Sequence, residues 1–161
     1  MRRARTITVL TTLTLALAVG GAAQAGVGSQ GDRSDQPGAG YSFAVIGDVP
    51  YGADQLAAFP GWIQQINEDP AVRSVVHLGD IKNGSSVCSD DYFRLIRRDF
   101  DTFEDGLVYT PGDNEWTDCH RANNGAYDPL ERLEKVREVF FDRPGRTLGQ
   151  DPFPVASQAD R

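Results

Sequence analysis

The run Phe43-Ala-Val-Ile-Gly-Asp48 is repeated in outline at Val75-Val-His-Leu-Gly-Asp80 and at Leu107-Val-Tyr-Thr-Pro-Gly-Asp113. Each copy is a short, continuous apolar segment that ends in Gly-Asp. Segments of this length and composition are typical of buried parallel strands. Asp80 follows Asp48 by 32 residues and Asp113 follows Asp80 by 33, so each interval has room for one helix and its connections. The three runs therefore predict an α/β fold with right-handed crossovers.

The segments between and after these runs have the periodicity of amphipathic helices. We expect the first helix to have Pro60 in its first turn, where proline is well tolerated. The third is expected to begin at the cap residue Asp128, followed by Pro129, and to stop before Pro144-Gly145. The apolar positions that define the three faces are Trp62, Ile63 and Ile66; Tyr92, Phe93, Ile96, Phe100 and Phe103; and Leu130, Leu133, Val136, Val139 and Phe140.

The aspartates that end the three runs indicate the chemistry. Ligands of open α/β sheets bind at the carboxyl ends of the strands, so parallel strands would deliver Asp48, Asp80 and Asp113 to one rim. Crowded carboxylates repel one another unless a cation lies between them, and divalent metal ions suit such a site. One Gly-Asp alone would indicate only a turn. Three at matching strand ends predict a metal site.

Composition and charge restrict the partners and the location of the chain. The formal net charge of −7 over 161 residues argues against binding to a nucleic-acid backbone or to an anionic membrane surface. Residues 1–25 combine an arginine-rich start, an apolar stretch and a small-residue cleavage site, the pattern of a secretory signal peptide. An uncleaved membrane anchor would need a longer apolar stretch. We expect residues 26–40 to be a flexible leader, residues 41–161 to be the domain, and the protein to be secreted with no membrane span after signal cleavage.

The stretch from about residue 41 to 120 resembles the N-terminal half of the calcineurin-like metallophosphoesterases. The family pattern runs Asp-x-His, then Gly-Asp, then Gly-Asn-His-Asp/Glu, and the matching stretches here are Gly47-Asp48, Gly79-Asp80 and Gly112-Asp-Asn-Glu115. The resemblance implies the first β-α-β-α-β half of an α/β/β/α sandwich. It also implies two divalent metal ions, such as Mn, Zn or Fe, and a phosphate-ester substrate.

The resemblance also implies roles for individual residues. Asp48 matches a ligand of one metal ion, and Asp80 matches the carboxylate that bridges both ions. Asp113 stands at the place of an asparagine ligand, although a shift by one residue would make Asn114 the ligand. Without that shift, Asn114 occupies the position of the histidine that assists catalysis.

The chain departs from the family pattern in two further places. Pro50 stands where the first motif has a histidine ligand, and its neighbour Tyr51 either supplies a phenolate or packs as a buried side chain. The three later histidines of the family are missing because the sequence stops at Arg161. The resemblance therefore predicts a partial, apparently truncated domain.

Few other side chains are candidates for the chemistry. His77 lies within a predicted strand, and because strand side chains alternate between faces we expect it to pack or hydrogen-bond in the sheet. His120 follows the third motif on a loop, where it is a general acid, a substitute metal ligand or a solvated loop residue. Lys82 and Arg121 are either phosphate contacts or exposed surface charges.

Two cysteines, Cys88 and Cys119, each follow one of the predicted site loops. A pair of cysteines in an exported protein predicts a disulfide, which would join the loop after Asp80 to the loop after Asp113. Metal-thiolate binding is the alternative, although the sequence lacks the closely spaced Cys-x-x-Cys pair of such sites.

Two functions follow from these observations. The first is an exported metal-dependent phosphoesterase, which hydrolyses phosphate esters with metal-activated water. The second is a non-catalytic remnant of the same half-fold that binds a divalent metal ion weakly. Because the family's histidines are missing, we expect weak metal binding and little or no turnover from this chain alone. The sequence indicates neither the particular substrate nor the oligomeric state.

Overall fold

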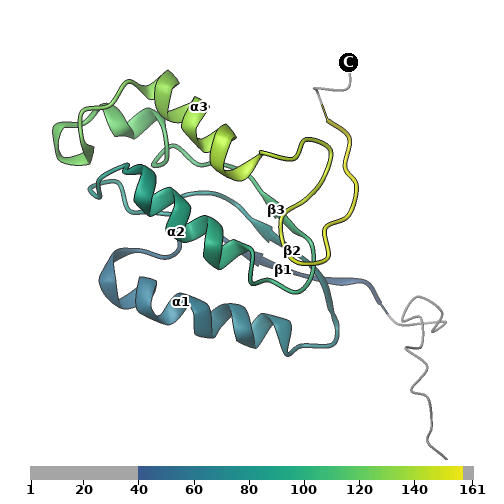
Figure 1. Cartoon of the computed structure of the whole chain (residues 1–161). Helices are drawn as coiled ribbons and strands as arrows, with labels where there is room; N and C mark the ends of the chain where they lie inside the picture. The colour runs from purple at the N-terminus through teal and green to yellow at the C-terminus, as the bar shows by residue number, and fades with distance from the viewer. Residues whose placement is uncertain (1–39, 158–161) are drawn as a thin grey trace, which may run out of the picture. The chain divides into compact units, whose positions relative to one another are not determined.

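A computed structural model describes residues 40–157 of the chain (Figure 1). Three parallel strands form one sheet in the order β1-β2-β3, with β1 at Ser42–Ile46, β2 at Val72–His77 and β3 at Leu107–Tyr109. This arrangement confirms the predicted α/β fold and its parallel sheet. The predicted signal peptide, and the predicted leader up to residue 39, lie outside the described residues.

Helices connect the strands and follow the last one. Helix α1 (Gly52–Asn67) joins β1 to β2, α2 (Asp90–Phe100) joins β2 to β3, and α3 (Pro129–Phe140) follows β3 after two short 3-10 turns, η2 (Thr117–His120) and η3 (Ala122–Asn124). Figure 1 shows the three α-helices on the same side of the sheet.

Among residues 40–157, no helix has both the length and the apolar character needed to cross a membrane.

Helix α1 starts earlier than the sequence predicted. The prediction placed Pro60 in the first turn, but the helix begins at Gly52 and Pro60 lies in its interior. A proline there removes one backbone hydrogen bond and normally destabilises a helix. Pro60 is exposed, whereas Phe59 and Ile63 on either side of it are buried. Tertiary packing of the apolar face therefore maintains the helix through the proline.

The other two helices begin at side-chain caps, of which the sequence analysis predicted only the one at Asp128. Ser89 accepts a hydrogen bond from the backbone N–H of Tyr92 at the start of α2. Asp128, the predicted cap of α3, accepts from the backbone N–H groups of Leu130 and Glu131, and Pro129 is the first helical residue. The predicted apolar face of α3 is wrong at one position, because Leu130 is exposed on the first turn while Val136 and Phe140 are buried.

The core lies between the helices and one face of the sheet. It is rich in aromatic side chains, and Phe100 contacts the rings of Phe59, Tyr109 and Phe140. The opposite face is uncovered within the described residues, since Phe43 and Val45 of β1 are 54% and 51% exposed. The expectation of strands buried on both faces is therefore wrong for β1, whose side chains alternate between core and solvent.

A segment after α3 returns to the free edge of β3. The backbone groups of Leu107 and Leu148 exchange two hydrogen bonds of 2.9 Å in an antiparallel bridge. No feature of the sequence pattern indicated this pairing. It covers the start of the edge strand, a position where unpaired backbone groups would otherwise face water.

Candidate metal site

Asp48, Asp80 and Asp113, the aspartate rim, follow the carboxyl ends of the three parallel strands and therefore share one end of the sheet. Burial raises the pKa of Asp80, and the negative charges of Asp113 and Asp48 raise it further. A hydrogen bond of 3.2 Å from the backbone N–H of Asn114 to Oδ1 of Asp80 opposes this effect. The charges of both neighbouring aspartates therefore act on the central carboxylate.

Two residues of the aspartate rim have a left-handed backbone. The φ angles are 57° for Asp48 and 56° for Asp80. A residue with a Cβ adopts the left-handed conformation at a cost of about 1 kcal/mol or more. Such a strained backbone persists only where the surrounding structure enforces it, and it is often found at binding sites. The loop after β2 helps to hold Asp48 in this conformation, because the Gly79 carbonyl accepts a 3.1 Å hydrogen bond from the Asp48 N–H.

Two glycines allow the loops after β2 and β3 to approach closely. A Cβ atom on Gly79 would lie 2.3 Å from the backbone nitrogen of Gly112, and Gly79 also has a φ of 96°. A Cβ atom on Gly112 would lie 2.1 Å from Oδ1 of Asp80 and 2.6 Å from its backbone nitrogen. Since real Cβ atoms do not approach other atoms this closely, only glycine fits at either position.

Glu115 joins the loop after β2 to the loop after β3 through hydrogen bonds. Its side chain is fully buried, and one carboxylate oxygen, Oε1, accepts hydrogen bonds from Ile81 N (3.2 Å), Gly112 N (3.2 Å) and the Tyr109 hydroxyl (2.8 Å). The other oxygen, Oε2, has no hydrogen-bond partner. Burial raises the pKa of Glu115, although the three donors oppose that effect. Sequence reasoning did not identify this residue as the clamp between the loops.

Lys82 is part of the protein interior and not a phosphate contact. Its side chain is 1% exposed, and Nζ donates to the carbonyl oxygens of Asn83 (3.0 Å) and Asn114 (2.9 Å). Burial lowers its pKa, while the negative charges of Glu115 and other carboxylates oppose this shift. The other candidate, Arg121, is half-exposed and forms an ion pair of 2.6 Å with Asp118.

Tyr51 lies at the aspartate rim and joins its first loop to its third. The phenol donates to Oδ1 of Asp48 at 3.0 Å, and Nδ2 of Asn114 donates to the phenol oxygen at 3.5 Å. Burial, the hydrogen bond to Asp48 and the neighbouring carboxylates raise the pKa of Tyr51. Tyr51 is therefore a neutral phenol beside the carboxylates. The Tyr51 side chain is half-buried, with its hydroxyl against the Asp48 carboxylate, and is therefore not the fully packed side chain of the second alternative.

Asn114 is buried at the centre of these contacts. Its amide nitrogen faces Tyr51, and its Oδ1 lies on the side of Gly84. An amide nitrogen has no lone pair for a metal ion. In this arrangement, ligation by Asn114 would require its amide to turn over, whereas Asp113 presents an exposed carboxylate that interacts with Asp80.

The two histidines have different surroundings. His77 is fully buried, and its Nδ1 accepts from the backbone N–H of Gly79 while Nε2 donates to the Val49 carbonyl, both at 3.1 Å. Burial lowers the pKa of His77 to about 4, so it is neutral near pH 7. This confirms the expectation that it packs and hydrogen-bonds within the sheet. His120 is exposed on η2, and its Nδ1 lies 2.6 Å from the Thr117 carbonyl oxygen.

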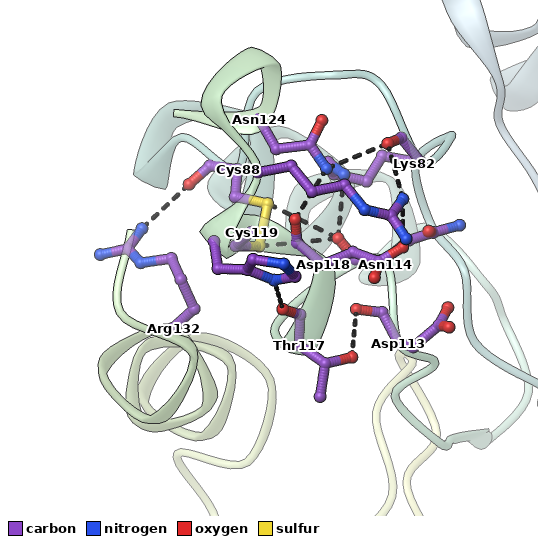
Figure 2. Close-up of a disulfide and its surroundings, with 12 residues drawn as sticks. Lys82, Cys88, Asp113, Asn114, Thr117, Asp118, Cys119, Asn124 and Arg132 are labelled. Carbon is purple, nitrogen blue, oxygen red and sulfur yellow. Dashed lines mark hydrogen bonds and ion pairs between the residues drawn. A yellow bond between two sulfur atoms is a disulfide. The ribbon is translucent and has the colours of Figure 1, made fainter. Parts of the chain in front are cut away.

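A disulfide joins Cys88, in the segment after β2, to Cys119, in the segment after β3 (Figure 2). This confirms the predicted pairing and removes the metal-thiolate alternative. Both cysteines are fully buried, and their sulfur atoms lie 3.5 and 3.6 Å from the Asn114 carbonyl oxygen. The carbonyl of Cys88 also accepts from Arg132 of α3. The disulfide therefore joins the two loops to each other, and the Arg132 hydrogen bond joins the first of them to α3.

The aspartate rim offers donors of one chemical kind. Its carboxylate oxygens, with the nearby Tyr51 oxygen, form a set of oxygen ligands that suits a divalent cation. Within residues 40–157, no group of three or more His, Cys, Asp or Glu side chains is arranged as a ready-made metal cage. Water, substrate or a turned Asn114 amide would have to complete the coordination.

No protein-family model, curated protein or solved structure matches this chain. The resemblance to the calcineurin-like metallophosphoesterases therefore rests on the motifs of the sequence.

Proposed function

We propose that this chain carries the metal-binding rim of a phosphoesterase, an enzyme that hydrolyses phosphate esters with metal-activated water. One observation supports the proposal most strongly. Three aspartates from three adjacent parallel strands share one rim, and two of them are held there with a left-handed backbone. Burial raises the pKa of the central aspartate, and the neighbouring carboxylates raise it further, an effect that a bound cation would relieve.

Each residue of the rim has a role in this proposal. Asp80 follows the central strand and would contact both metal ions, while Asp48 and Asp113 would each bind one of them. Tyr51 holds the Asp48 carboxylate in place through its 3.0 Å hydrogen bond. Divalent ions bound there would activate water and withdraw charge from the phosphoryl group.

His120 is the candidate for proton transfer to the leaving oxygen. A carbonyl oxygen can only accept a hydrogen bond, so the 2.6 Å contact with Thr117 places the ring proton on Nδ1. The exposed Nε2 is then free to gain and donate a proton. Residue Thr117 also donates to the Asp113 carbonyl at 3.0 Å, which connects the turn carrying His120 to the aspartate rim.

The finer assignments belong to the same proposal. The described residues would form the first β-α-β-α-β half of the α/β/β/α sandwich of calcineurin-like metallophosphoesterases. The uncovered face of β1, where Phe43 and Val45 are about half exposed, is where a second sheet layer would pack. The enzyme would be exported, on the evidence of the signal-peptide pattern in residues 1–25.

A second candidate is a chain that binds metal without turnover. The observation that favours it is the shortage of imidazole at the rim. Pro50 and Asn114 replace two histidines of the family pattern, and both ring nitrogens of His77 are already hydrogen-bonded. Among the described residues, general acid catalysis by an imidazole would then depend on His120.

Direct metal binding tests the proposal. Mn²⁺ is titrated calorimetrically into the full chain, its Asp80→Asn variant, and Glu134→Gln, an exposed α3 control. We expect Asp80→Asn to lower the affinity by about tenfold or more, since it removes a ligand charge at nearly constant shape, and to lower it more than Glu115→Gln does. Equal affinity in wild type and Asp80→Asn would refute the metal site. Turnover of an aryl phosphate with Mn²⁺, Zn²⁺ or Fe²⁺ then separates the two candidates, because only the enzyme loses activity in Asp80→Asn.

A further inference from the structure

The sequence contains two Asn-Gly pairs, Asn83-Gly84 in the loop after β2 and Asn124-Gly125 at the end of η3. An asparagine that precedes glycine can react with its own chain, because glycine has no Cβ to obstruct the approach. The glycine nitrogen attacks the side-chain carbon Cγ, a five-membered succinimide closes, and ammonia leaves. The hydrogen bonds around the attacking nitrogen, the carbonyl and the leaving amide therefore decide whether a given pair reacts.

The side-chain carbonyl of Asn83 is surrounded by hydrogen-bond donors. Its Oδ1 accepts from the Ser85 backbone N–H (2.9 Å), the Ser85 hydroxyl (2.8 Å) and the Ser86 hydroxyl (3.0 Å). Attack on Cγ moves negative charge onto Oδ1, and donors at this distance stabilise such a charge. The leaving amide nitrogen, Nδ2, donates to no other residue within 40–157. The loop therefore activates the Asn83 carbonyl and leaves its amide free to depart.

The attacking nitrogen belongs to a polarised peptide group. The Asn83 carbonyl oxygen, in the same peptide group as the Gly84 N–H, accepts from Lys82 Nζ at 3.0 Å and from the Ser86 N–H at 3.2 Å. Both donors draw electron density from the peptide group, so the Gly84 N–H gives up its proton more readily. Asn83 and Gly84 are half-buried beside the exposed Ser85. Water therefore reaches the pair.

Asn124-Gly125 has the opposite surroundings at each of these points. Asn124 is fully buried, its Nδ2 donates to the carbonyls of Gly84 (3.1 Å) and Asp118 (3.0 Å), and its Oδ1 has no hydrogen-bond partner. The Gly125 N–H is also engaged, since it donates to the Ala122 carbonyl at 3.3 Å. The attacking nitrogen and the leaving amide are both held, and no donor stabilises charge on Oδ1. Two pairs that are identical in sequence therefore differ in reactivity.

We propose that Asn83 is a site of self-modification, at which the folded chain converts asparagine to aspartate or isoaspartate. The bond from Gly84 N to Cγ forms, the bond from Cγ to Nδ2 breaks, and the Gly84 proton leaves with Nδ2 as ammonia. One water then opens the succinimide at either carbonyl, adding hydroxyl to carbon and hydrogen to nitrogen. Either product adds a carboxylate to the loop after β2. Isoaspartate also lengthens the main chain by one carbon next to the residue, Lys82, whose Nζ joins this loop to Asn114.

The test follows both Asn-Gly pairs in the same molecule. The full chain is incubated near neutral pH in heavy-oxygen water and then digested with trypsin in ordinary water, so that only conversions in the intact chain carry the label. Mass spectrometry measures the label in the peptides that contain Asn83 and Asn124. The variants are Asn83→Gln, whose longer side chain cannot close the five-membered ring, and Ser85→Ala combined with Ser86→Ala, which removes two donors to Oδ1.

We expect the Asn83 peptide to gain heavy oxygen about tenfold or more faster than the Asn124 peptide, the double serine variant to slow this by about threefold or more, and Asn83→Gln to gain none at this position. Equal rates at the two pairs, an equal or faster rate in the serine variant, or cleavage of the chain after Asn83 instead of labelling would each overturn the inference. If the serine variant unfolds, which a faster Asn124 rate would reveal, the comparison of the two pairs in the wild type decides.

Discussion

The contact between the loops after β2 and β3 predicts that Gly112→Ala is damaging. The added Cβ would lie 2.1 Å from Oδ1 of Asp80 and 2.6 Å from the Asp80 backbone nitrogen. A rotation of the Asp80 side chain would relieve the first clash but not the second. One of the two loops must therefore move away from the other.

The loss of stability can be derived from the contacts that such a movement of the loops disturbs. Overpacking a closely packed position costs about 1–3 kcal/mol. The separation also weakens the hydrogen bonds from Asn114 N to Asp80 and from Gly112 N to Glu115, both 3.2 Å long, at about 1 kcal/mol each. We therefore expect Gly112→Ala to lower the free energy of unfolding by about 2–4 kcal/mol.

Urea unfolding, followed by far-UV circular dichroism, measures this effect, and Gly61→Ala is the matched control. Gly61 lies inside α1 with no atom within 4 Å of an added Cβ, so alanine should stabilise the helix by about 0.5–1 kcal/mol. The Mn²⁺ affinity should fall in Gly112→Ala and stay unchanged in Gly61→Ala. A Gly112→Ala variant within about 0.5 kcal/mol of wild type would show that the two loops are not in contact as described.

Three further predictions concern the supports of the rim. Replacing Cys88 and Cys119 by alanine should lower the free energy of unfolding in urea by about 3–4 kcal/mol, because the disulfide closes a loop with a sequence separation of 31. A decrease below about 1 kcal/mol would contradict the chain-entropy reasoning. Folding lowers the pKa of His77 from 6.5 to about 4, so the unfolded state takes up a proton at a higher pH than the native state does. The free energy of unfolding should therefore fall by about 3 kcal/mol as the pH is lowered from 6.5 to 4. Unfolding curves at several pH values check this, and a His77→Gln variant should lack that part of the loss. Glu115→Ala leaves three hydrogen-bond donors without an acceptor and should lower the free energy of unfolding by about 3 kcal/mol or more. Glu115→Gln keeps an accepting oxygen and should lower it clearly less. Equal decreases would contradict the proposed role of the Glu115 carboxylate in joining the two loops.

The sequence pattern predicted the elements whose signal is local. Three apolar runs ending in Gly-Asp became three parallel strands with their aspartates at one end. The Asp128 cap and the Cys88–Cys119 pair were also predicted correctly. The strands and the cap depend on residue types and short spacings, and the disulfide follows because the sequence contains just two cysteines.

The errors arose where tertiary packing overrides the local signal. The start of α1 was placed too late because Pro60 favours a first turn, while burial of Phe59 and Ile63 extends the helix on both sides of it. Lys82 and Glu115 were not recognised as interior residues because charged side chains are usually exposed. Their burial depends on partners that lie 32 and 34 residues away in sequence, a separation over which no local pattern extends.

Two buried polar side chains connect the loops that carry the aspartate rim. His77 joins the loop after β1 to the loop after β2 at Gly79, and Glu115 joins the loop after β2 at Ile81 to the loop after β3 at Gly112. Each therefore spans one of the two gaps between neighbouring strands. Because a buried hydrogen-bonding group has few alternative arrangements that satisfy it, these two contacts fix three loops that short strands alone would leave free to shift. The geometry of the aspartate rim therefore depends on two residues outside it, His77, three positions before Asp80, and Glu115, two positions after Asp113.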